Sequence, residues 1–187
     1  MTKELSIRQG ILYALVAGMV VLARPELPTF LAGAALAFLG IALRVWACGY
    51  LQKNKRVVSS GPYARVQHPL YLGTAIITLG AILAGGSPHW PAWLIWGVIG
   101  PAFFTYFYLF YFPKKQRVEG DRLERRFGEE YARFRREVPP FLPALRRWPL
   151  ADREPWSLKT LLSNHELEMD LLIAILFAAL WLPGRIF

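Results

Sequence analysis

Five apolar runs, each followed by a polar or turn-forming segment, divide the chain into candidate helices. They cover residues 7–23, 29–51, 70–84, 90–112 and 164–182. The second run, at about 1.5 Å per helical residue, is long enough to cross a hydrocarbon core of about 30 Å. Its small residues Gly33, Ala37 and Gly40 recur at helical spacing and predict close packing on another helix. The pattern predicts an all-α, polytopic membrane helix bundle of about five transmembrane helices.

Prolines and glycines set the predicted ends of the middle helices. A turn at residues 85–88 joins the third and fourth runs into a hairpin, because its glycines and Pro88 cannot continue a helix. Pro101 predicts a kink inside the fourth run, and Pro113 predicts the end of that run. The segment 113–163 then follows as the largest part of the chain outside the apolar runs.

The fifth run has two interpretations. Residues 163–166, with the sequence Ser-Asn-His-Glu, form a capping-box pattern in which Glu166 returns to the cap nitrogen. A helix that starts there has about 20 residues, which is just enough to span the bilayer. Pro183 and Gly184 cut the run short, so a helix lying on the membrane surface is the alternative.

Basic residues gather on one side of the predicted topology. Thirteen Lys or Arg lie between Pro113 and Thr160, and the loop after the second run adds Lys53, Lys55, Arg56 and Arg65. Cytoplasmic loops carry an excess of positive charge, so the N-terminus and both basic loops are predicted to be cytoplasmic, with the C-terminus outside.

Composition agrees with a single integral membrane domain covering residues 1–187. The chain is 55% hydrophobic, its mean hydropathy is +0.30, and its formal net charge is +9. In a membrane protein such charge marks cytoplasmic loops and contacts anionic lipid headgroups, so the bilayer is the expected partner and nucleic acid is not. The single cysteine, Cys48, excludes an intramolecular disulfide. The sequence makes no prediction of the oligomeric state.

The segment 113–163 is predicted to contain amphipathic helices. Leu123, Phe127, Tyr131 and Phe134 share one face at helical spacing. The segment, taken alone, is typical of a helix pair that lies on lipid headgroups. Together with the Gly61–Gly73 stretch, it predicts a cytoplasmic segment that covers a bound cofactor.

The residues Gly61 to Gly73 set a histidine, two tyrosines and an arginine against the mouth of an apolar helix. At such a position, a cytoplasmic loop can bind a polar cofactor within reach of a lipid-soluble substrate. This arrangement favours interfacial group-transfer chemistry. The three histidines, at positions 68, 89 and 165, are too scattered along the predicted topology to form a zinc or iron site.

Several motifs in the same order carry a family resemblance. They are Gly61-Pro62-Tyr63, His68-Pro69-Leu70-Tyr71-Leu72-Gly73 with Gly80, Glu119, Leu123, Phe127-Gly128-Glu129-Glu130-Tyr131, and Val138-Pro139 with Pro143. Over residues 57–143 the chain resembles the isoprenylcysteine carboxyl methyltransferase family, to which phospholipid N-methyltransferases are related. The resemblance implies an integral membrane enzyme that uses S-adenosylmethionine. The cofactor would bind on the cytoplasmic side, between the His-Pro helix start and the helix that contains Glu119.

The resemblance implies a set of cofactor-binding residues. They are Tyr63, Arg65, His68, Pro69, Tyr71, Gly73, Glu119 and Tyr131. No catalytic residue is assigned, because methyl transfer from a sulfonium depends mainly on alignment, which contributes about 7–11 kcal/mol. Each residue also has a structural interpretation: His68 as a helix cap, Glu119 as a surface ion-pair partner and the tyrosines as interfacial anchors. Arg44 either faces the substrate cavity or extends its charge to the interface.

Four positions depart from the family pattern. Gln67 stands where an arginine precedes the His-Pro pair, Gly120 replaces a second glutamate, Phe134 replaces a tyrosine, and Pro140 replaces an arginine. An arginine fork suits a carboxylate, so the loss at Pro140 points to a different acceptor or to lost activity.

The expected acceptor is a lipophilic small molecule or a prenylated one, reacting as an isoprenylcysteine-type carboxylate or thiol, or an amine lipid. Two alternatives belong to other classes. One is an NADPH-dependent membrane reductase of the sterol-reductase kind, whose C-terminal region is similar in layout. The other is a non-catalytic relative that keeps the bundle and binds lipid.

Overall fold

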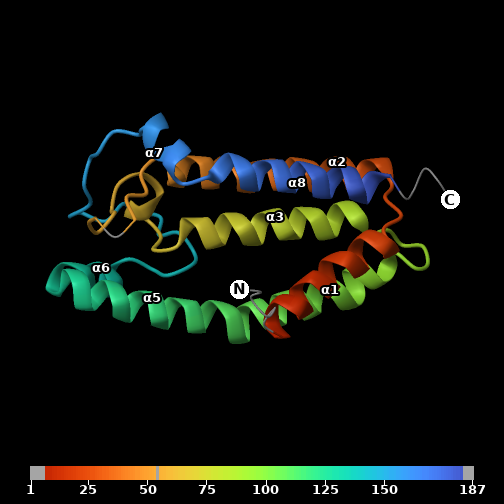
Figure 1. The fold of residues 1–187 in the computed structure, drawn as a ribbon, viewed down its shortest axis with the longest axis horizontal. Helices are drawn as coiled ribbons and strands as arrows, with labels where there is room; N and C mark the ends of the chain where they lie inside the picture. Colours follow the sequence, from red (N-terminus) through yellow and green to blue (C-terminus); the bar gives the residue numbers. More distant parts are fainter. Residues whose placement is uncertain (1–6, 54, 183–187) are drawn as a thin grey trace, which may run out of the picture.

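The computed structural model describes residues 7–53 and 55–182 as helices joined by turns and loops (Figure 1). The α-helices are α1 (Ile7–Leu22), α2 (Leu27–Cys48), α3 (Pro69–Gly85), α4 (Gly100–Tyr106), α5 (Phe112–Phe127), α6 (Glu129–Glu137), α7 (Leu158–Ser163) and α8 (Glu166–Trp181). A 3-10 turn, η1 (Gly61–Ala64), and two π-helical segments, η2 (Ile95–Ile99) and η3 (Phe107–Tyr111), complete the order. The described residues contain no strand, which confirms the all-α prediction.

Two helices are long and apolar enough to cross a membrane. They are α2 and the continuous helix Ile95–Phe127, and only 22% of the apolar window of each is buried inside the protein. The core helix of a soluble protein is mostly buried, whereas here large side chains such as Phe38 and Leu39 face outward. The apolar helices Tyr13–Leu22 and Pro69–Gly85 are shorter. The five-span topology therefore stays a prediction, while two helices carry membrane-spanning character.

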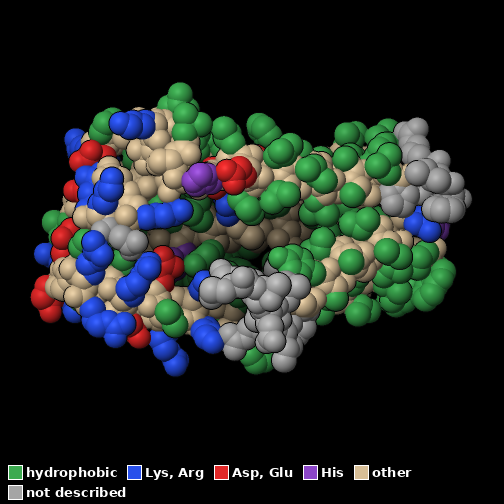
Figure 2. Space-filling view, in the orientation of Figure 1, with side chains coloured by type: hydrophobic (Ala, Val, Ile, Leu, Met, Phe, Trp, Pro, Cys, Tyr) green, Lys and Arg blue, Asp and Glu red, His purple; other side chains and the backbone are tan. Residues whose placement is uncertain are grey.

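Charged side chains gather at one end of the molecule. On the face drawn in Figure 2, Lys, Arg, Asp and Glu side chains gather at the end that holds α6 and α7, and the side chains away from that end are mainly hydrophobic. Figure 1 places the start of α3 and the second half of α5 at that same end. The charged end is therefore where a site can combine polar groups with the ends of apolar helices.

Helices α2 and α3 pack through small residues, as the spacing of Gly33, Ala37 and Gly40 predicts. A Cβ atom added to Gly40 would lie 2.7 Å from the carbonyl oxygen of Gly73, and one added to Gly80 would lie 2.5 Å from the carbonyl oxygen of Gly33. These distances are shorter than a van der Waals contact, so only glycine allows the two backbones to lie this close. Figure 1 shows α8 running beside this pair.

The prediction that Pro113 ends the fourth helix is wrong. The helix continues through Pro113 to Phe127. Pro113 and Pro101 each occupy the second position of an α-helical segment that directly follows a π-helical one. The backbone hydrogen-bond register changes at such a junction, so the missing N–H of proline leaves the helix unbroken. As a consequence, Glu119 lies on the same continuous helix, Ile95–Phe127, that begins among the apolar helices.

The capping-box interpretation of residues 163–166 is also wrong. Helix α7 ends at Ser163, and α8 begins at Glu166 after His165, which adopts a left-handed conformation with φ 56°. The carboxylate of Glu166 does not return to the cap but binds Arg44 of α2. A partner on a different helix has displaced the local capping interaction.

Gly40→Ala should destabilise the bundle. Alanine normally favours a helix over glycine by about 1 kcal/mol, but here the added methyl group meets the α3 backbone, and overpacking costs about 1–3 kcal/mol. Gly10→Ala is the matched control, because no atom lies within 4 Å of the Cβ that it adds to α1. Thermal unfolding in detergent should show a lower midpoint for Gly40→Ala only; equal midpoints would contradict the close contact.

Candidate functional site

Two segments distant in sequence lie side by side at the charged end. Residues 64–68 run beside residues 139–148, joined by four backbone hydrogen bonds. The bonds are Gln67 N to Pro139 O (2.9 Å), His68 N to Pro140 O (3.2 Å), Ala144 N to Arg65 O (2.8 Å) and Trp148 N to Ala64 O (2.7 Å). The segment before α3 is thereby fixed against the segment after α6, as required if the two stretches enclose one ligand.

The side chain of Gln67 strengthens this junction. Its Nε2 donates to the carbonyl oxygen of Arg135 at 3.0 Å and also to that of Val138. Both carbonyls belong to the C-terminal end of α6 and the residue after it, where backbone acceptors lack helical partners. Gln67 thus takes a structural role at the position where the family resemblance expects an arginine.

A cavity of about 520 Å³ opens beside this junction, here called the His68 cavity. Six of the eight residues that the resemblance places at the cofactor line it. They are Tyr63, His68, Pro69, Tyr71, Glu119 and Tyr131. The structure thus brings η1, the start of α3, α5 and α6 together at one concave site.

Tyr71 links the two principal elements of the His68 cavity. Its hydroxyl donates to Oε2 of Glu119 at 3.1 Å, which connects α3 to α5. The ring of His68 lies 5.3 Å from the ring of Tyr71, centroid to centroid, and meets the ring of Phe112 edge-on at 5.7 Å. His68 and Glu119 therefore face one hollow, and packing on two sides fixes the orientation of the imidazole.

The cavity wall contains buried polar atoms that have no partner among the described residues. They are the Tyr63 hydroxyl, Oε1 of Gln67 and Nε2 of His68, and all three side chains are less than 10% exposed. An unsatisfied buried polar atom costs about 1–3 kcal/mol, and native proteins contain few of them. Residues that line this one cavity thus carry several polar atoms whose hydrogen bonds are incomplete within the part of the chain that the structure describes.

Burial also sets the protonation of these groups. Loss of solvent lowers the pKa of His68 below its ordinary 6.5; the carboxylate of Glu119 opposes this shift, and the guanidinium of Arg135 reinforces it. Burial raises the pKa of Tyr63 well above 10. Both residues are therefore neutral at pH 7, so His68 can accept a hydrogen bond through one ring nitrogen and Tyr63 can donate one.

A basic rim surrounds this wall, and it was not among the residues expected at the site. It consists of Lys53, Arg56, Lys115 and Arg122, with Glu119 as the acidic residue of the cavity lining. The sequence analysis assigned such residues to membrane orientation, headgroup contacts and a surface ion pair with Glu119, and not to the cavity. The signal that could have found them was the position of Lys115 and Arg122 one helical turn on either side of Glu119.

The remaining altered positions also have structural roles. Phe134 lines the His68 cavity and packs edge-on against Trp148 at a centroid distance of 5.4 Å. Gly120 is covered by Arg135, whose Cζ would lie 2.9 Å from an added Cβ. Phe134 and Tyr131 belong to a buried cluster against which Leu123 and Phe127 pack. The four side chains lie on two helices, α5 and α6, and not on the one helical face that their spacing predicted.

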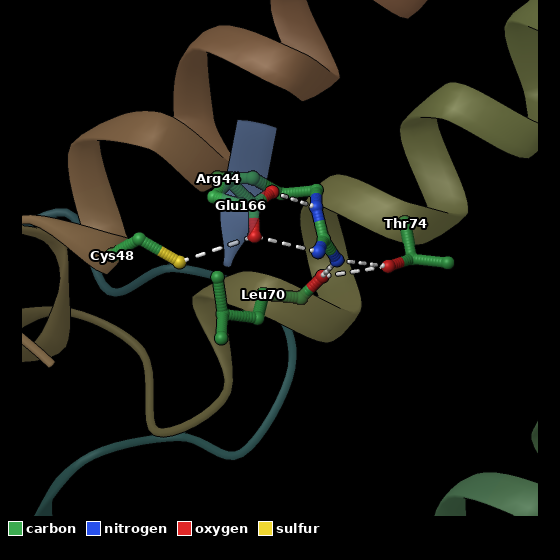
Figure 3. A network of polar contacts seen from close by, with 5 residues as sticks. All are labelled: Arg44, Cys48, Leu70, Thr74 and Glu166. Carbon is green, nitrogen blue, oxygen red and sulfur yellow. Dashed lines mark hydrogen bonds and ion pairs between the residues drawn. The ribbon is translucent and has the colours of Figure 1, made fainter. Parts of the chain in front are cut away.

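Arg44 lies outside the lining of the His68 cavity, in a polar network between α2, α3 and α8 (Figure 3). Its Nε and Nη2 donate to the two carboxylate oxygens of Glu166 at 2.6 and 3.0 Å, and its Nη1 donates to Oγ1 of Thr74 at 2.7 Å and to the carbonyl oxygen of Leu70 at 3.3 Å. Cys48 Sγ donates to Glu166 at 3.3 Å. This Arg44–Glu166 network is a satisfied helix clamp, and the sequence analysis missed Glu166 as the partner of Arg44.

Two other residues expected at the cofactor also lie elsewhere. Gly73 faces α2, where an added Cβ would lie 2.5 Å from Cγ of Arg44. Arg65 is exposed and lines a separate hollow, beside Trp46 and Tyr50. The structure therefore gives Gly73 a packing role and places Arg65 away from His68, although the two share one short motif.

Comparison with known proteins adds a partial relative. No family model matches the chain, and no solved structure matches it. The cobalt-zinc-cadmium resistance protein CzcN of Cupriavidus metallidurans is 31% identical over 118 residues, which are 59% of this chain and 49% of that protein. The chain therefore spans about half the length of the curated relative that it matches.

Glu166→Gln should destabilise the bundle strongly. The substitution leaves the guanidinium of Arg44 buried without its counter-charge, and breaking a buried ion pair costs about 3–5 kcal/mol. Glu168→Gln is the matched control on the same helix, because its side chain is 76% exposed. Thermal unfolding in detergent should show a large loss for the first variant and little change for the second; similar midpoints would mean that the network does not clamp the helices.

The stability of the protein should depend on pH through His68. Because the pKa of His68 is lowered below 6.5 in the folded protein, the unfolded chain binds a proton that the folded chain does not, between the lowered value and 6.5. Stability should therefore fall as the pH drops through this window. His68→Gln should remove this part of the pH dependence. His89→Gln is the control and should retain it, because the side chain of His89 is 81% exposed. The measurement is the thermal unfolding midpoint of each variant from pH 5 to 8, and the slope of midpoint against pH is compared between variants.

Proposed function

We propose that the protein is an integral membrane S-adenosylmethionine-dependent methyltransferase that acts on a lipophilic acceptor. One observation carries the proposal: His68, Tyr71 and Glu119, from distant parts of the chain, line one cavity, and several of its lining residues carry buried polar atoms without a partner among the described residues. Several of the motifs that resemble the methyltransferase family contribute residues to this cavity.

The residues fit this cofactor through the unpaired atoms. The Tyr63 hydroxyl and Nε2 of His68 can each donate or accept, and Oε1 of Gln67 can accept, which suits the amine, hydroxyl and carboxylate groups of S-adenosylmethionine. When bound, the cofactor supplies an electrophilic methyl group on a sulfonium. Glu119 would accept hydrogen bonds from the ribose hydroxyls or the cofactor amine, and tyrosine rings would provide faces for the positive sulfonium.

The protein's part in such a reaction is alignment and exclusion of water. Tyr71 holds Glu119 through its hydroxyl, and the rings of Tyr71 and Phe112 hold His68, so the polar wall is preorganised. A neutral His68 adds no further positive charge to a cavity lining that already contains Lys53, Arg56, Lys115 and Arg122. No described residue is needed as a strong base if the acceptor is a thiolate or an amine.

The acceptor we propose is a thiol or an amine lipid rather than a carboxylate. The two arginines of the family pattern are replaced by Gln67, which binds backbone carbonyls, and by Pro140. Arg44, the other candidate for a carboxylate, already has both oxygens of Glu166 as partners. A lipophilic acceptor would reach the cavity from the membrane, because the cavity lies where α3 and α5 enter the charged end.

The membrane topology belongs to the same proposal. Five spans with the N-terminus and the His68 cavity on the cytoplasmic side would place the basic end of the molecule where positive charge is enriched. The gathering of charged side chains at the end with α6 and α7 supports this orientation. The exposed apolar surface of α2 and of Ile95–Phe127 supports a lipid environment.

A second candidate is an NADPH-dependent membrane reductase. The observation that favours it is the basic rim of Lys53, Arg56, Lys115 and Arg122, because four positive side chains suit the phosphates of NADPH better than a cofactor with one sulfonium. The printed name of the relative refers to metal resistance. Within residues 7–53 and 55–182 no group of three or more potential ligands is placed to hold a metal ion, so we do not propose metal binding.

Isothermal titration of the detergent-solubilised protein tests both candidates. S-adenosylhomocysteine should bind and NADPH should not, and His68→Ala and Glu119→Ala should each weaken binding by about tenfold or more, which is about 1.4 kcal/mol. Glu130→Ala, an exposed carboxylate on α6, is the control and should bind as the wild type does. Binding of NADPH alone would favour the reductase, and unchanged affinity in both site variants would remove the site assignment.

A further inference from the structure

A second hollow, of about 520 Å³, lies at the charged end beside the end of α2. We call it the Arg65 hollow. Trp46 and Tyr50 form its apolar part, and three arginines, Arg65, Arg147 and Arg153, line it together with two carboxylates. The His68 cavity contains none of these residues, so the two hollows are separate.

The carboxylates of the Arg65 hollow are already engaged. Glu154 forms an ion pair with Arg56 at 2.7 Å, and Oδ2 of Asp152 accepts a hydrogen bond from the Ser59 hydroxyl at 3.0 Å. Each of these partners lies outside the lining of the hollow. Because Glu154 is paired with Arg56 and Ser59 is neutral, Asp152 is the main negative charge that opposes the three arginines.

Two of the arginines are available for a ligand. Arg147 donates to the backbone carbonyls of Ala151 and Asp152. Arg65 and Arg153, by contrast, make no side-chain hydrogen bond or ion pair within the part of the chain that the structure describes, and both are exposed. Two free guanidinium groups in one hollow suit a ligand that presents several anionic oxygens.

With α2 placed across a membrane, as its length and apolar surface favour, the hollow would lie at the depth of lipid headgroups. Trp46, which is 44% exposed, belongs to the last turn of α2, one of the two helices able to span a membrane. Tryptophan is enriched at the boundary between hydrocarbon and headgroups, and the arginines follow just beyond this boundary. A ligand bound here would contact apolar surface on one side and guanidinium groups on the other.

We propose that the Arg65 hollow binds the phosphate group of an anionic membrane phospholipid. Arg65 and Arg153 donate hydrogen bonds to the phosphate oxygens, and Trp46 contacts the glycerol and the first part of the acyl chains. The exposed tryptophan favours a lipid over free phosphate, because a soluble anion would gain nothing from the apolar side of the hollow.

The test compares lipids on the detergent-solubilised protein. Thermal unfolding is followed while phosphatidylglycerol, phosphatidylcholine or inorganic phosphate is added. Phosphatidylglycerol should raise the midpoint, and the other two should have little effect. In Arg65→Gln/Arg153→Gln the phosphatidylglycerol concentration that gives half of the maximal rise should increase about tenfold, because charge-assisted hydrogen bonds are lost.

The matched control is Arg117→Gln/Arg125→Gln, which removes the same charge from exposed positions of α5 outside both hollows. It should respond to phosphatidylglycerol as the wild type does. Equal loss in both double variants would show a general charge effect and overturn the site. An equal rise with phosphatidylcholine, or with inorganic phosphate, would also overturn the proposal of an anionic lipid.

Discussion

The hydrogen bonds between Gln67-His68 and Pro139-Pro140 are the constraint on which the site depends. Neither proline has an N–H to donate, so this segment offers only carbonyl oxygens. Gln67 and His68 precede a helix that begins with proline, so their own N–H groups have no helical acceptor. At these positions the bonds can run only from residues 67 and 68 to the proline carbonyls, whereas Ala144 and Trp148 donate in the opposite direction further along. The pairing holds the start of α3 beside the end of α6 at the His68 cavity.

Two buried polar assemblies lie near each other, and their hydrogen bonding separates their roles. In the Arg44–Glu166 network both charges and the Thr74 hydroxyl have partners, so the assembly is complete without a ligand. Around the His68 cavity, Tyr63 and His68 keep polar atoms without partners. Completed polar clusters stabilise a fold, whereas incomplete ones cost stability that a ligand can recover. This difference supports assigning ligand binding to the His68 cavity and helix clamping to Arg44.

The sequence predicted what is local and missed what depends on distant partners. Apolar periodicity located the helices, and small residues at helical spacing identified the contact of α2 with α3. Glu166 looked like a cap because its partner, Arg44, lies 122 positions away. Pro113 looked like a helix end because proline usually interrupts a helix. The sequence did not reveal the π-helical segment before it, which lets the helix continue through Pro113. Each error arose where a tertiary contact or a change of helical register overrode a local preference.

The candidate site shows the same division. Motif resemblance grouped most of the residues that meet at the His68 cavity, but Arg65, the residue after η1, lines the separate Arg65 hollow. The basic rim was visible only once Arg56 and Arg122 shared a cavity. The sequence therefore predicted which residues lie at the charged end. Their division between the His68 cavity and the Arg65 hollow became visible only in the fold.

One ion pair joins these two sites. Arg56 lines the His68 cavity, and its partner Glu154 lines the Arg65 hollow, so the pair forms part of the wall between them. Nε of Arg56 is a further buried atom without a partner among the described residues. Removing either member of this pair would therefore change the charge that lines both the His68 cavity and the Arg65 hollow.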